Sequence, residues 1–262
     1  MLIKGLSIVI LNDRHDQIFH EALLSAAIAQ ELIVFEQDIN NDWPKLEKKL
    51  KKINPQLKLR LIFRKYPIKD FAELRNKAVK MVKTPWLMFL DSDEILSSKN
   101  LAQLPNLLKK KKVAAYKIKR LDFFHGQKLR FGEAGNCQPI RLARSDRIRY
   151  QRSIHEIALI NGRVEQSYLL IKHLAHKNLE EFLKAIDRYA QLEAIYRLSK
   201  KQKQSKLALC LQLFFYPPAK FLVNYLFKLG FLDGFAGLSY AVVMSFHSLL
   251  VRIYLYEKYF IN

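Results

Sequence analysis

Three carboxylates follow a run of apolar residues in the segment 86–94, which reads WLMFLDSDE. Five consecutive apolar residues are typical of a buried strand in a parallel sheet. Asp91, Asp93 and Glu94 then fall at the carboxyl end of that strand, where open α/β sheets bind their ligands. Alternation along an extended segment would turn Asp91 and Asp93 to one side. Two carboxylates facing one point suit Mg²⁺ or Mn²⁺, with water and a diphosphate completing the coordination shell.

A structural interpretation of the same acids stands beside the metal site. Asp93 or Ser97 would cap the first turn of a helix that follows the strand, because short polar side chains accept hydrogen bonds from the free N–H groups there. An Asp-x-Asp tripeptide is common and does not by itself decide between the two interpretations.

The elements that must position these acids alternate between strand-like and helix-like stretches. This alternation predicts an α/β domain with a largely parallel sheet. Strands are expected at 6–11, 31–36, 57–63, 85–91 and 113–124, and helices at 18–30, 43–53 and 70–82. From residue 179 the apolar residues recur at helical spacing without strand signals. We therefore expect a catalytic domain over 1–178 and a C-terminal helical region over 179–262.

Three stretches together resemble the family 2 glycosyltransferases, and most closely the bacterial branch that builds lipopolysaccharide core and related envelope glycans. They are 70–96 (DFAELRNKAVKMVKTPWLMFLDSDEIL), 140–156 (IRLARSDRIRYQRSIHE) and 225–241 (YLFKLGFLDGFAGLSYA). The resemblance implies the Rossmann-like GT-A fold. It also implies metal-dependent, inverting transfer of a sugar from a nucleotide diphosphate sugar to a glycan or lipid-linked acceptor.

The resemblance gives the donor side its expected residues. Asp91 would lie near the ribose and the metal, and Asp93 would hold the Mg²⁺ or Mn²⁺ that bridges the diphosphate, with His173 as a further ligand. A departing nucleoside diphosphate gains negative charge, which a divalent cation stabilises. The residues expected to bind the donor are Asn12, Glu36, Arg75, Asn76 and Asp91. Asn12 and Glu36 stand where the family usually carries Thr-x-Asn and Asp-Gly-Ser-Thr-Asp motifs, which leaves the nucleotide open.

The acceptor side needs a carboxylate that takes the proton from the attacking hydroxyl. The resemblance implies that Glu156 is this base and that His155 orients it or contacts the diphosphate. Glu94, Arg141 and Arg144 are expected to line the acceptor or phosphate site, although both arginines also fit ordinary surface charges. A zinc site at His173 and His176 is not expected, because no cysteine pair or HExxH pattern accompanies them.

The chain of 262 residues carries a formal net charge of +21, which implies an anionic partner: a nucleic acid, a membrane surface or a phosphorylated substrate. No RNP, zinc-finger or helix-turn-helix signature supports nucleic acid, so none is expected. The aromatic segments 207–227 and 235–256 fit helices that lie on an anionic membrane or pack as core, with Pro217-Pro218 dividing the first. We expect a cytoplasmic protein held peripherally on the cytoplasmic face of the inner or plasma membrane.

Two further interpretations of function remain open at this stage. One is a non-catalytic basic protein that binds nucleic acid or membrane, and the other is a nucleotidyltransferase on the same fold. Cys137 and Cys210 are expected to be reduced thiols packed in the core, because they form no CxxC pair.

Overall fold

The computed structural model describes residues 2–12, 14–36, 42–64, 70–152, 156–175, 178–200 and 205–261. Contacts within the chain separate it into two compact units. The first contains 1–120 and 138–174, and the second contains 121–137 and 175–262. The second unit thus combines the C-terminal part of the chain with a segment from its middle. The expected domain boundary at residue 178 stays a prediction.

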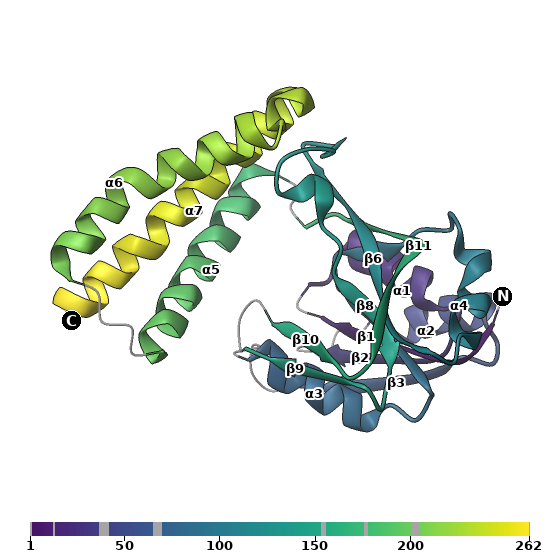
Figure 1. Ribbon diagram of the computed structural model, residues 1–262. Coiled ribbons are helices and arrows are strands. Elements are labelled where there is room, and N and C mark those ends of the chain that lie inside the picture. Colours follow the sequence, from purple (N-terminus) through teal and green to yellow (C-terminus); the bar gives the residue numbers. More distant parts are fainter. Residues whose placement is uncertain are drawn as a thin grey trace. The chain divides into compact units, whose positions relative to one another are not determined.

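The first unit is built on a mixed sheet with the strand order β3-β2-β1-β4-β8-β6-β11-β5 (Figure 1). The strands are β1 (Ile3–Leu11), β2 (Ala29–Glu36), β3 (Lys58–Phe63), β4 (Trp86–Asp91), β5 (Glu94–Leu96), β6 (Val113–Phe124), β8 (Ile140–Arg144) and β11 (Arg163–His173). β3, β2, β1 and β4 are parallel, which confirms the predicted α/β core. β8 then pairs antiparallel with both β4 and β6, and β5 with β11. The strand β6 was predicted at these residues, but its antiparallel pairing and the strands β5, β8 and β11 were not. β7 (Gln127–Lys128) pairs with β6, and β9 (Ile148–Gln151) with β10 (Ile157–Ile160) forms a separate hairpin.

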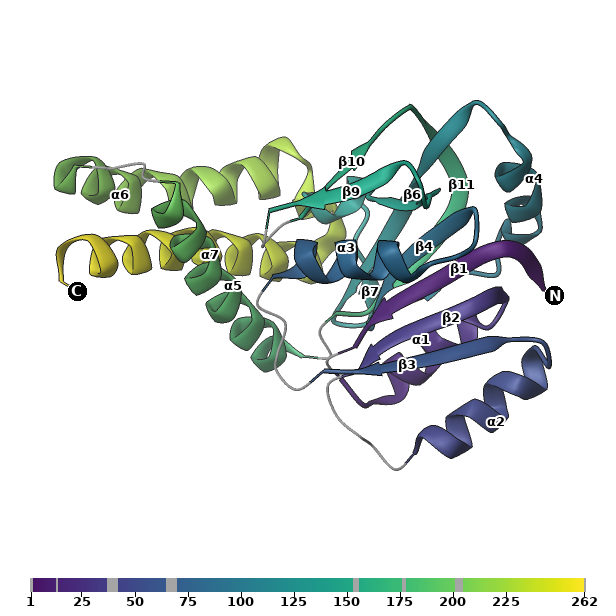
Figure 2. The same cartoon turned by 90° about the horizontal axis from the view of Figure 1, so that it is seen from below.

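Helices cover both faces of the parallel strands (Figure 2), and the alternation of β1 shows why. Ile8 and Ile10 belong to a core shared with α1 (Gln17–Ala26), α2 (Trp43–Ile53) and α4 (Leu104–Lys109). Val9 and Leu11 point to the other face and pack with α3 (Phe71–Met81) and the β9–β10 hairpin. Both faces of the central strand are therefore buried, as an uninterrupted apolar strand requires.

Local signals set where the helices begin and end. Asp16 and Asp70 cap α1 and α3 by accepting the backbone N–H of Phe19 (3.1 Å) and Glu73 (2.8 Å). α1 was predicted to reach residue 30 but ends at Ala26, because Ala29 already pairs with Ile3 as part of β2. A short 3-10 turn, η1 (Leu101–Gln103), precedes α4.

The second unit consists mainly of three helices, with α7 (Gly234–Phe260) packed between α5 (Leu179–Ser199) and α6 (Lys206–Leu222) (Figure 1). A π-helical turn, η3 (Val223–Phe227), and a 3-10 turn, η4 (Gly230–Asp233), connect α6 to α7, and η2 (Ala134–Asn136) lies in the loop 121–137. The carboxylate of Asp233 accepts the N–H groups of Arg130 (2.8 Å) and Phe131 (2.9 Å), which ties that loop to the start of α7.

Two expectations about this unit are corrected. Pro217-Pro218 does not divide the helix, because α6 runs through both prolines, and the carbonyl oxygen of Pro217 accepts a hydrogen bond from the Ser245 hydroxyl of α7 (2.5 Å). Cys210 is exposed and Cys137 half-buried, so neither thiol is a core residue, and the two form no disulfide bond with each other. The C-terminal helices themselves are confirmed.

Candidate active site

The candidate site lies where three parallel strands end side by side. In the register of the sheet Leu11 pairs with Phe35 on one side and with Asp91 on the other. Asn12 and Glu36 are the next positions on β1 and β2, and both are fully buried. The Asn12 side chain donates to Glu36 Oε2 at 2.8 Å, and its backbone N–H donates to the Phe35 carbonyl oxygen at 2.8 Å. The carboxyl ends of β1, β2 and β4 therefore meet at one edge of the sheet.

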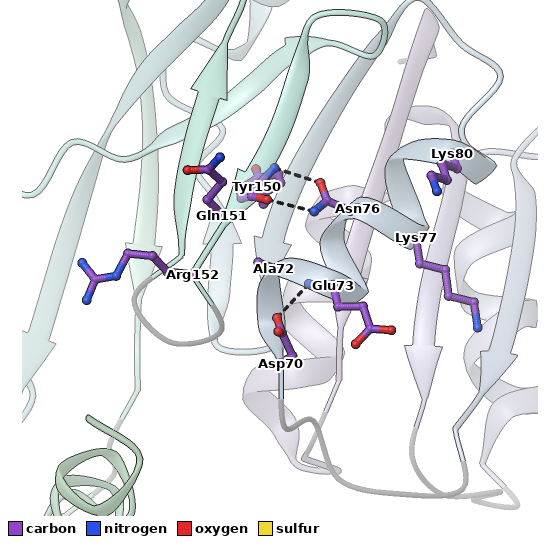
Figure 3. Close-up of a pocket in the computed structure, with 9 residues that line it drawn as sticks. All are labelled: Asp70, Ala72, Glu73, Asn76, Lys77, Lys80, Tyr150, Gln151 and Arg152. Carbon is purple, nitrogen blue, oxygen red and sulfur yellow. Dashed lines mark hydrogen bonds between the residues drawn. The ribbon is translucent and has the colours of Figure 1, made fainter. Parts of the chain in front are cut away.

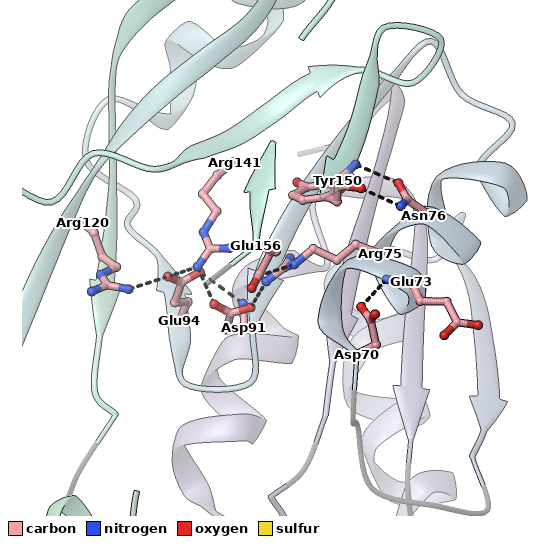
Figure 4. Close-up of polar contacts among 10 residues, drawn as sticks. All are labelled: Asp70, Glu73, Arg75, Asn76, Asp91, Glu94, Arg120, Arg141, Tyr150 and Glu156. Atoms are coloured by element: carbon pink, nitrogen blue, oxygen red, sulfur yellow. Dashed lines mark hydrogen bonds and ion pairs between the residues drawn. The ribbon is translucent and has the colours of Figure 1, made fainter. Parts of the chain in front are cut away.

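Asp91 sits between two arginines (Figure 4). Arg75, from α3, donates to Asp91 Oδ1 at 2.6 Å and to Glu156 Oε1 at 2.8 Å. Arg141, from β8, donates to Asp91 Oδ2 and, at 2.6 Å, to Glu94 Oε1. Asp91 thereby connects Glu156, which precedes β10, with Glu94, which begins β5.

A third arginine completes this arrangement. Arg120 Nη1, from β6, lies 3.8 Å from Glu94 Oε1. The backbone N–H of Asp91 also donates to Glu94 Oε2 at 3.1 Å, which fixes the turn between β4 and β5. We call the six side chains the ion-pair network: they are Glu156, Arg75, Asp91, Arg141, Glu94 and Arg120. Three carboxylates balance three guanidinium groups, so the network carries no net charge.

Burial makes this network electrostatically strong. Only 1% of the Arg75 side chain is exposed, and its guanidinium lies 4.8 Å from the centre of the Phe89 ring and 5.5 Å from that of Tyr150. Burial acts to lower the pKa of Arg75, but Asp91 and Glu156 outweigh it, so the pKa is raised. Burial acts to raise the pKa of Asp91, but Arg141 and Arg75 outweigh it and hold that pKa below its usual value. Burial raises the pKa of Tyr150 to about 12, against the opposing effect of Arg75.

Asp93 has different neighbours from Asp91, because the strand ends at Asp91 and a turn follows. His173 Nε2 lies 3.6 Å from Asp93 Oδ1, and Arg14 Nη1 lies 3.9 Å from Oδ2. The pKa of Asp93 is raised, first by burial and then by the charges of Asp91 and Glu94. Its Oδ1 atom is buried and has no hydrogen-bond partner among the described residues.

These residues fit a divalent cation only in part. A buried carboxylate oxygen without a hydrogen bond is a suitable ligand for Mg²⁺ or Mn²⁺, and His173 adds a nitrogen beside it. Within the described residues, however, no group of three or more His, Cys, Asp or Glu side chains gathers at one point. A cation held by Asp93 would need most of its ligands from water and a bound diphosphate, which is how Mg²⁺ usually binds beside phosphates.

Several predicted site residues lie elsewhere. Arg144 pairs in register with Trp86, at the opposite end of β4 from Asp91, and its guanidinium lies 4.8 Å from the centre of the Trp86 ring. The structure therefore does not bring Arg144 to the site. Asn76 pairs with both backbone groups of Tyr150, donating to its carbonyl oxygen at 2.9 Å and accepting its N–H at 2.8 Å. His155 and His176 lie outside the described residues.

The helix-cap interpretation of the acids is wrong. Glu94 opens the strand β5, and the next helical turn, η1, has Asn100 at its N-cap. A shallow cavity of about 480 Å³ lies between α3 and the end of β9, lined by Asn76 and Tyr150 among others (Figure 3). The carboxylates of the ion-pair network do not line it, so the site rests on the strand ends and not on this cavity.

Sequence reasoning missed four neighbours of the site. His15 Nε2 lies 3.3 Å from Glu36 Oε1, while Arg14 pairs with Asp16, its Nε donating to Asp16 Oδ1 at 3.1 Å. Their position directly after β1 was the available signal, because loops at the carboxyl ends of parallel strands carry binding residues. Arg120 and Tyr150 gave no comparable signal. Arg120 lies on β6, which joins the sheet through β8, and Tyr150 lies on a separate hairpin and is bound by Asn76 of α3.

No protein-family model and no curated protein sequence matches the chain. Solved structures match it in fold. The mannosyltransferase PcManGT from Pyrobaculum calidifontis, in complex with GDP-Man and Mn²⁺, is similar at a TM-score of 0.56 and 11% identity, over 97% of this chain and 88% of that chain. The fold is GT-A. Residues 1–349 of S. aureus TarS align over 97% of this chain and 90% of that chain at 13% identity, with a TM-score of 0.47.

At these identities the likeness extends to the GT-A fold alone. The strand ends that carry Asn12, Glu36 and Asp91 are thus the carboxyl edge of a GT-A sheet. Membership of family 2 and of its envelope-glycan branch stays a prediction.

Proposed function

We propose that the chain is a glycosyltransferase that moves a sugar from a nucleotide diphosphate sugar to a glycan or lipid-linked acceptor, with inversion, in the synthesis of cell-envelope polysaccharide or lipopolysaccharide. The observation that carries the proposal is the pair of carboxylates, Asp91 and Glu156, bound to one buried guanidinium at the carboxyl edge of a GT-A sheet. PcManGT, on the same fold, was solved with GDP-Man and Mn²⁺.

On the donor side, Asn12 and Glu36 would bind the base or ribose, and Asp91 would lie near the ribose and the metal. Asp93 and His173 would hold Mg²⁺ or Mn²⁺ with the diphosphate. The cation, when bound, supplies positive charge against the negative charge that grows on the departing nucleoside diphosphate.

On the acceptor side, Glu156 would take the proton of the attacking hydroxyl as that oxygen bonds to the anomeric carbon and the bond to the diphosphate breaks. Arg75 binds Glu156 Oε1 at 2.8 Å and so restricts the orientation of a carboxylate whose side chain is 19% exposed. Glu94 is fully buried. In this proposal Glu94 and Arg141 therefore hold Asp91 in place and do not contact the acceptor.

The proposed location is the cytoplasmic face of a membrane. Two segments, Lys206–Phe227 and Gly230–Phe260, are long and apolar enough to cross a bilayer, with mean hydropathies of 1.2 and 1.5. Length and composition alone do not separate a spanning helix from one that lies on the membrane or packs in a protein core. A lipid-linked acceptor would be presented at such a surface.

The first test is donor binding by the purified full chain. Nucleotide sugars are screened by thermal shift with Mn²⁺, since a ligand that binds only the folded state raises the melting temperature by mass action. We expect one donor to shift the melting temperature in a Mn²⁺-dependent manner, and Asp93→Asn to remove that dependence.

The second test is transfer of the sugar from that donor. Glu156→Gln should retain donor binding and lower turnover by about 10²–10⁴-fold, the usual contribution of a general base. Arg144→Gln is the control, because Arg144 lies at the far end of β4. If Asp93→Asn and Glu156→Gln both turn over like the wild type, the site assignment is wrong. Pyrophosphate release from a nucleoside triphosphate would indicate nucleotidyl transfer instead, and nucleic-acid binding with a steep salt dependence would indicate a binding protein.

A further inference from the structure

The outer helix of the second unit presents an apolar stripe to the outside. Its large side chains recur at the three- and four-residue spacing of one helix face. We call this set the α6 stripe: Leu207 (70% exposed), Leu211 (50%), Phe214 (80%), Phe215 (66%), Leu222 (43%) and Leu226 (48%). A helix in a soluble protein usually turns its apolar face toward the core. α6 turns this apolar face outward instead.

The opposite side of α6 already has its packing partner. Leu209 is fully buried and belongs to a cluster with Val251 and Leu255 of α7. The guanidinium of Arg252, also on α7, lies 3.8 Å from the centre of the Tyr216 ring of α6. The contacts of α6 with α7 that these residues make therefore do not involve the α6 stripe.

More exposed aromatic side chains follow the stripe along the chain. Phe227 of η3 is 78% exposed, Phe231 of η4 is 42% exposed, and Phe235 at the start of α7 is 73% exposed. A phenylalanine buries about 150–250 Å² when fully covered. Phe214, Phe215, Phe227 and Phe235 together thus expose roughly 600 Å² of apolar surface.

The charges around the stripe identify its partner. The thirteen positions 207–219 contain no charged residue, whereas Lys200, Lys201, Lys203 and Lys206 cluster directly before them. Lys228, at the other end, is exposed. Lysines beside an apolar, aromatic helix face match the headgroups and acyl chains of an anionic bilayer. A second copy of the chain would bring the same lysines to this face, whereas Glu133, which pairs with Lys220 and lies 3.9 Å from Lys228, is one acid near it.

The neighbour of α7 excludes a spanning arrangement. α5 runs beside α7 from Tyr240, which stacks on Phe182 with ring centres 5.8 Å apart, to Leu255, which packs with Leu198. A spanning segment of about 20 residues within Gly230–Phe260 would include most of 240–255. It would draw the adjoining part of α5 into the hydrocarbon, and that part carries Lys184, Asp187, Arg188, Glu193 and Arg197.

We propose that α6 lies in the plane of the membrane, with the α6 stripe inserted into one leaflet of an anionic bilayer and α5 left in water. This inference rests on the proposed membrane location, which it specifies, and not on sugar transfer. The proposed partner of the α6 stripe is the bilayer, and the proposed attachment is monotopic.

The first experiment measures binding of the full chain to vesicles of phosphatidylcholine mixed with phosphatidylglycerol, with pure phosphatidylcholine vesicles alongside. Phe214→Glu should lower the affinity about tenfold or more, because it removes a large apolar side chain and adds a like charge to that of the lipid. Ile195→Glu, which makes the same charge change at a half-exposed position of α5, should leave the affinity unchanged. Pure phosphatidylcholine should bind more weakly.

The second experiment separates a helix in the plane from one that spans. Tryptophan replaces Leu211, Phe215 or Leu222, one at a time, and its fluorescence is quenched by lipids brominated near the headgroup or near the chain end. The wild type, with Trp43 and Trp86 alone, gives the background signal. In the plane of the membrane all three report one shallow depth. In a spanning helix Leu211 and Leu222 would differ by about 16 Å, because each residue rises about 1.5 Å.

The proposal fails if the wild type does not bind anionic vesicles, if Phe214→Glu binds as well as the wild type, or if the three depths are graded. It also fails if light scattering shows a dimer that Phe214→Glu dissociates, since a second copy would then cover the stripe. Vesicle binding needs no donor. Loss of donor turnover in the function assay therefore leaves this inference intact, and loss of vesicle binding leaves the site assignment intact.

Discussion

Replacing Arg75 by methionine probes the centre of the ion-pair network. Methionine has a similar length and no charge, so the substitution removes the guanidinium that binds Asp91 Oδ1 and Glu156 Oε1. It also leaves the aromatic contacts of Phe89 and Tyr150 filled by an apolar side chain. We expect a large loss of stability in the first unit.

The magnitude follows from what remains after the substitution. Removing one partner of a buried ion pair usually costs about 3–5 kcal/mol, because the other charge stays buried. Here Asp91 keeps Arg141, and the side chains of Asp91 and Glu156 are 35% and 19% exposed, so water can reach both. Arg75 Nη1 is buried without a hydrogen bond among the described residues. The substitution therefore also removes the free-energy cost of burying that unpaired donor. The lower limit, about 3 kcal/mol, is therefore expected.

Urea unfolding monitored by tryptophan fluorescence isolates this effect. Trp43 and Trp86, the two tryptophans of the chain, both lie in the first unit. At an m-value of about 1–3 kcal/mol per molar, the midpoint should fall by about 1 M or more at unchanged slope. Arg144→Met, which removes a cation from the face of Trp86 and a hydrogen bond to the Val113 carbonyl oxygen, should cost only about 1 kcal/mol. Equal losses in the two variants would refute the reasoning.

Three further outcomes are expected. The pKa of Asp91 is held below its usual value of 3.8, so its stabilising effect is complete above about pH 5 and is lost as the pH falls through the folded value. Asp91→Asn should thus lower stability at neutral pH and flatten the acid limb of a stability–pH curve, and an unchanged acid limb would count against the network. Gly237→Ala should destabilise the second unit by about 2 kcal/mol or more, measured by circular dichroism, since the new Cβ would lie 2.0 Å from the Gly230 carbonyl oxygen. If the Gly237→Ala variant melted at the wild-type temperature, that close packing would be disproved. Asn76→Ala leaves the N–H and C=O of Tyr150 unpaired and should cost about 2 kcal/mol in urea unfolding, a value that a loosely held β9 would not show.

Local patterns predicted the parallel half of the sheet and the strand β6, but not the other antiparallel strands. The helix expected at 43–53 is observed at those residues, and the strand expected at 31–36 is extended by two residues. Apolar runs and aspartate caps act over a few neighbouring residues, so they can be identified in the sequence. The pairing of the three-residue strand β5 with β11 joins residues more than seventy positions apart. No local pattern encodes such a contact.

The rule that ligands bind at strand ends depends only on where strands stop, and β4 does end at Asp91 as expected. Asn12 and Glu36 were expected from the family resemblance, and they follow the neighbouring strand positions Leu11 and Phe35. The roles of all three residues stay predictions. The alternation expected for Asp91 and Asp93 did not apply, since a turn follows Asp91 and gives the two carboxylates different neighbours. Arg141 and Arg144 lie three apart on β8, so their side chains point to opposite faces. That spacing was available in the sequence and separates the two arginines.

The charge balance of the ion-pair network also constrains how this sequence can change over time. Any single exchange of Asp91, Glu94 or Arg141 for a neutral residue leaves an uncompensated buried charge, whereas a joint exchange of both partners can be nearly neutral in stability. Substitutions at these positions should therefore occur in pairs among related chains. Arg75 and Arg141 are each bound to two acids, so a change at either arginine affects both of its partners. Among the charged residues of the network, these two arginines should consequently vary least.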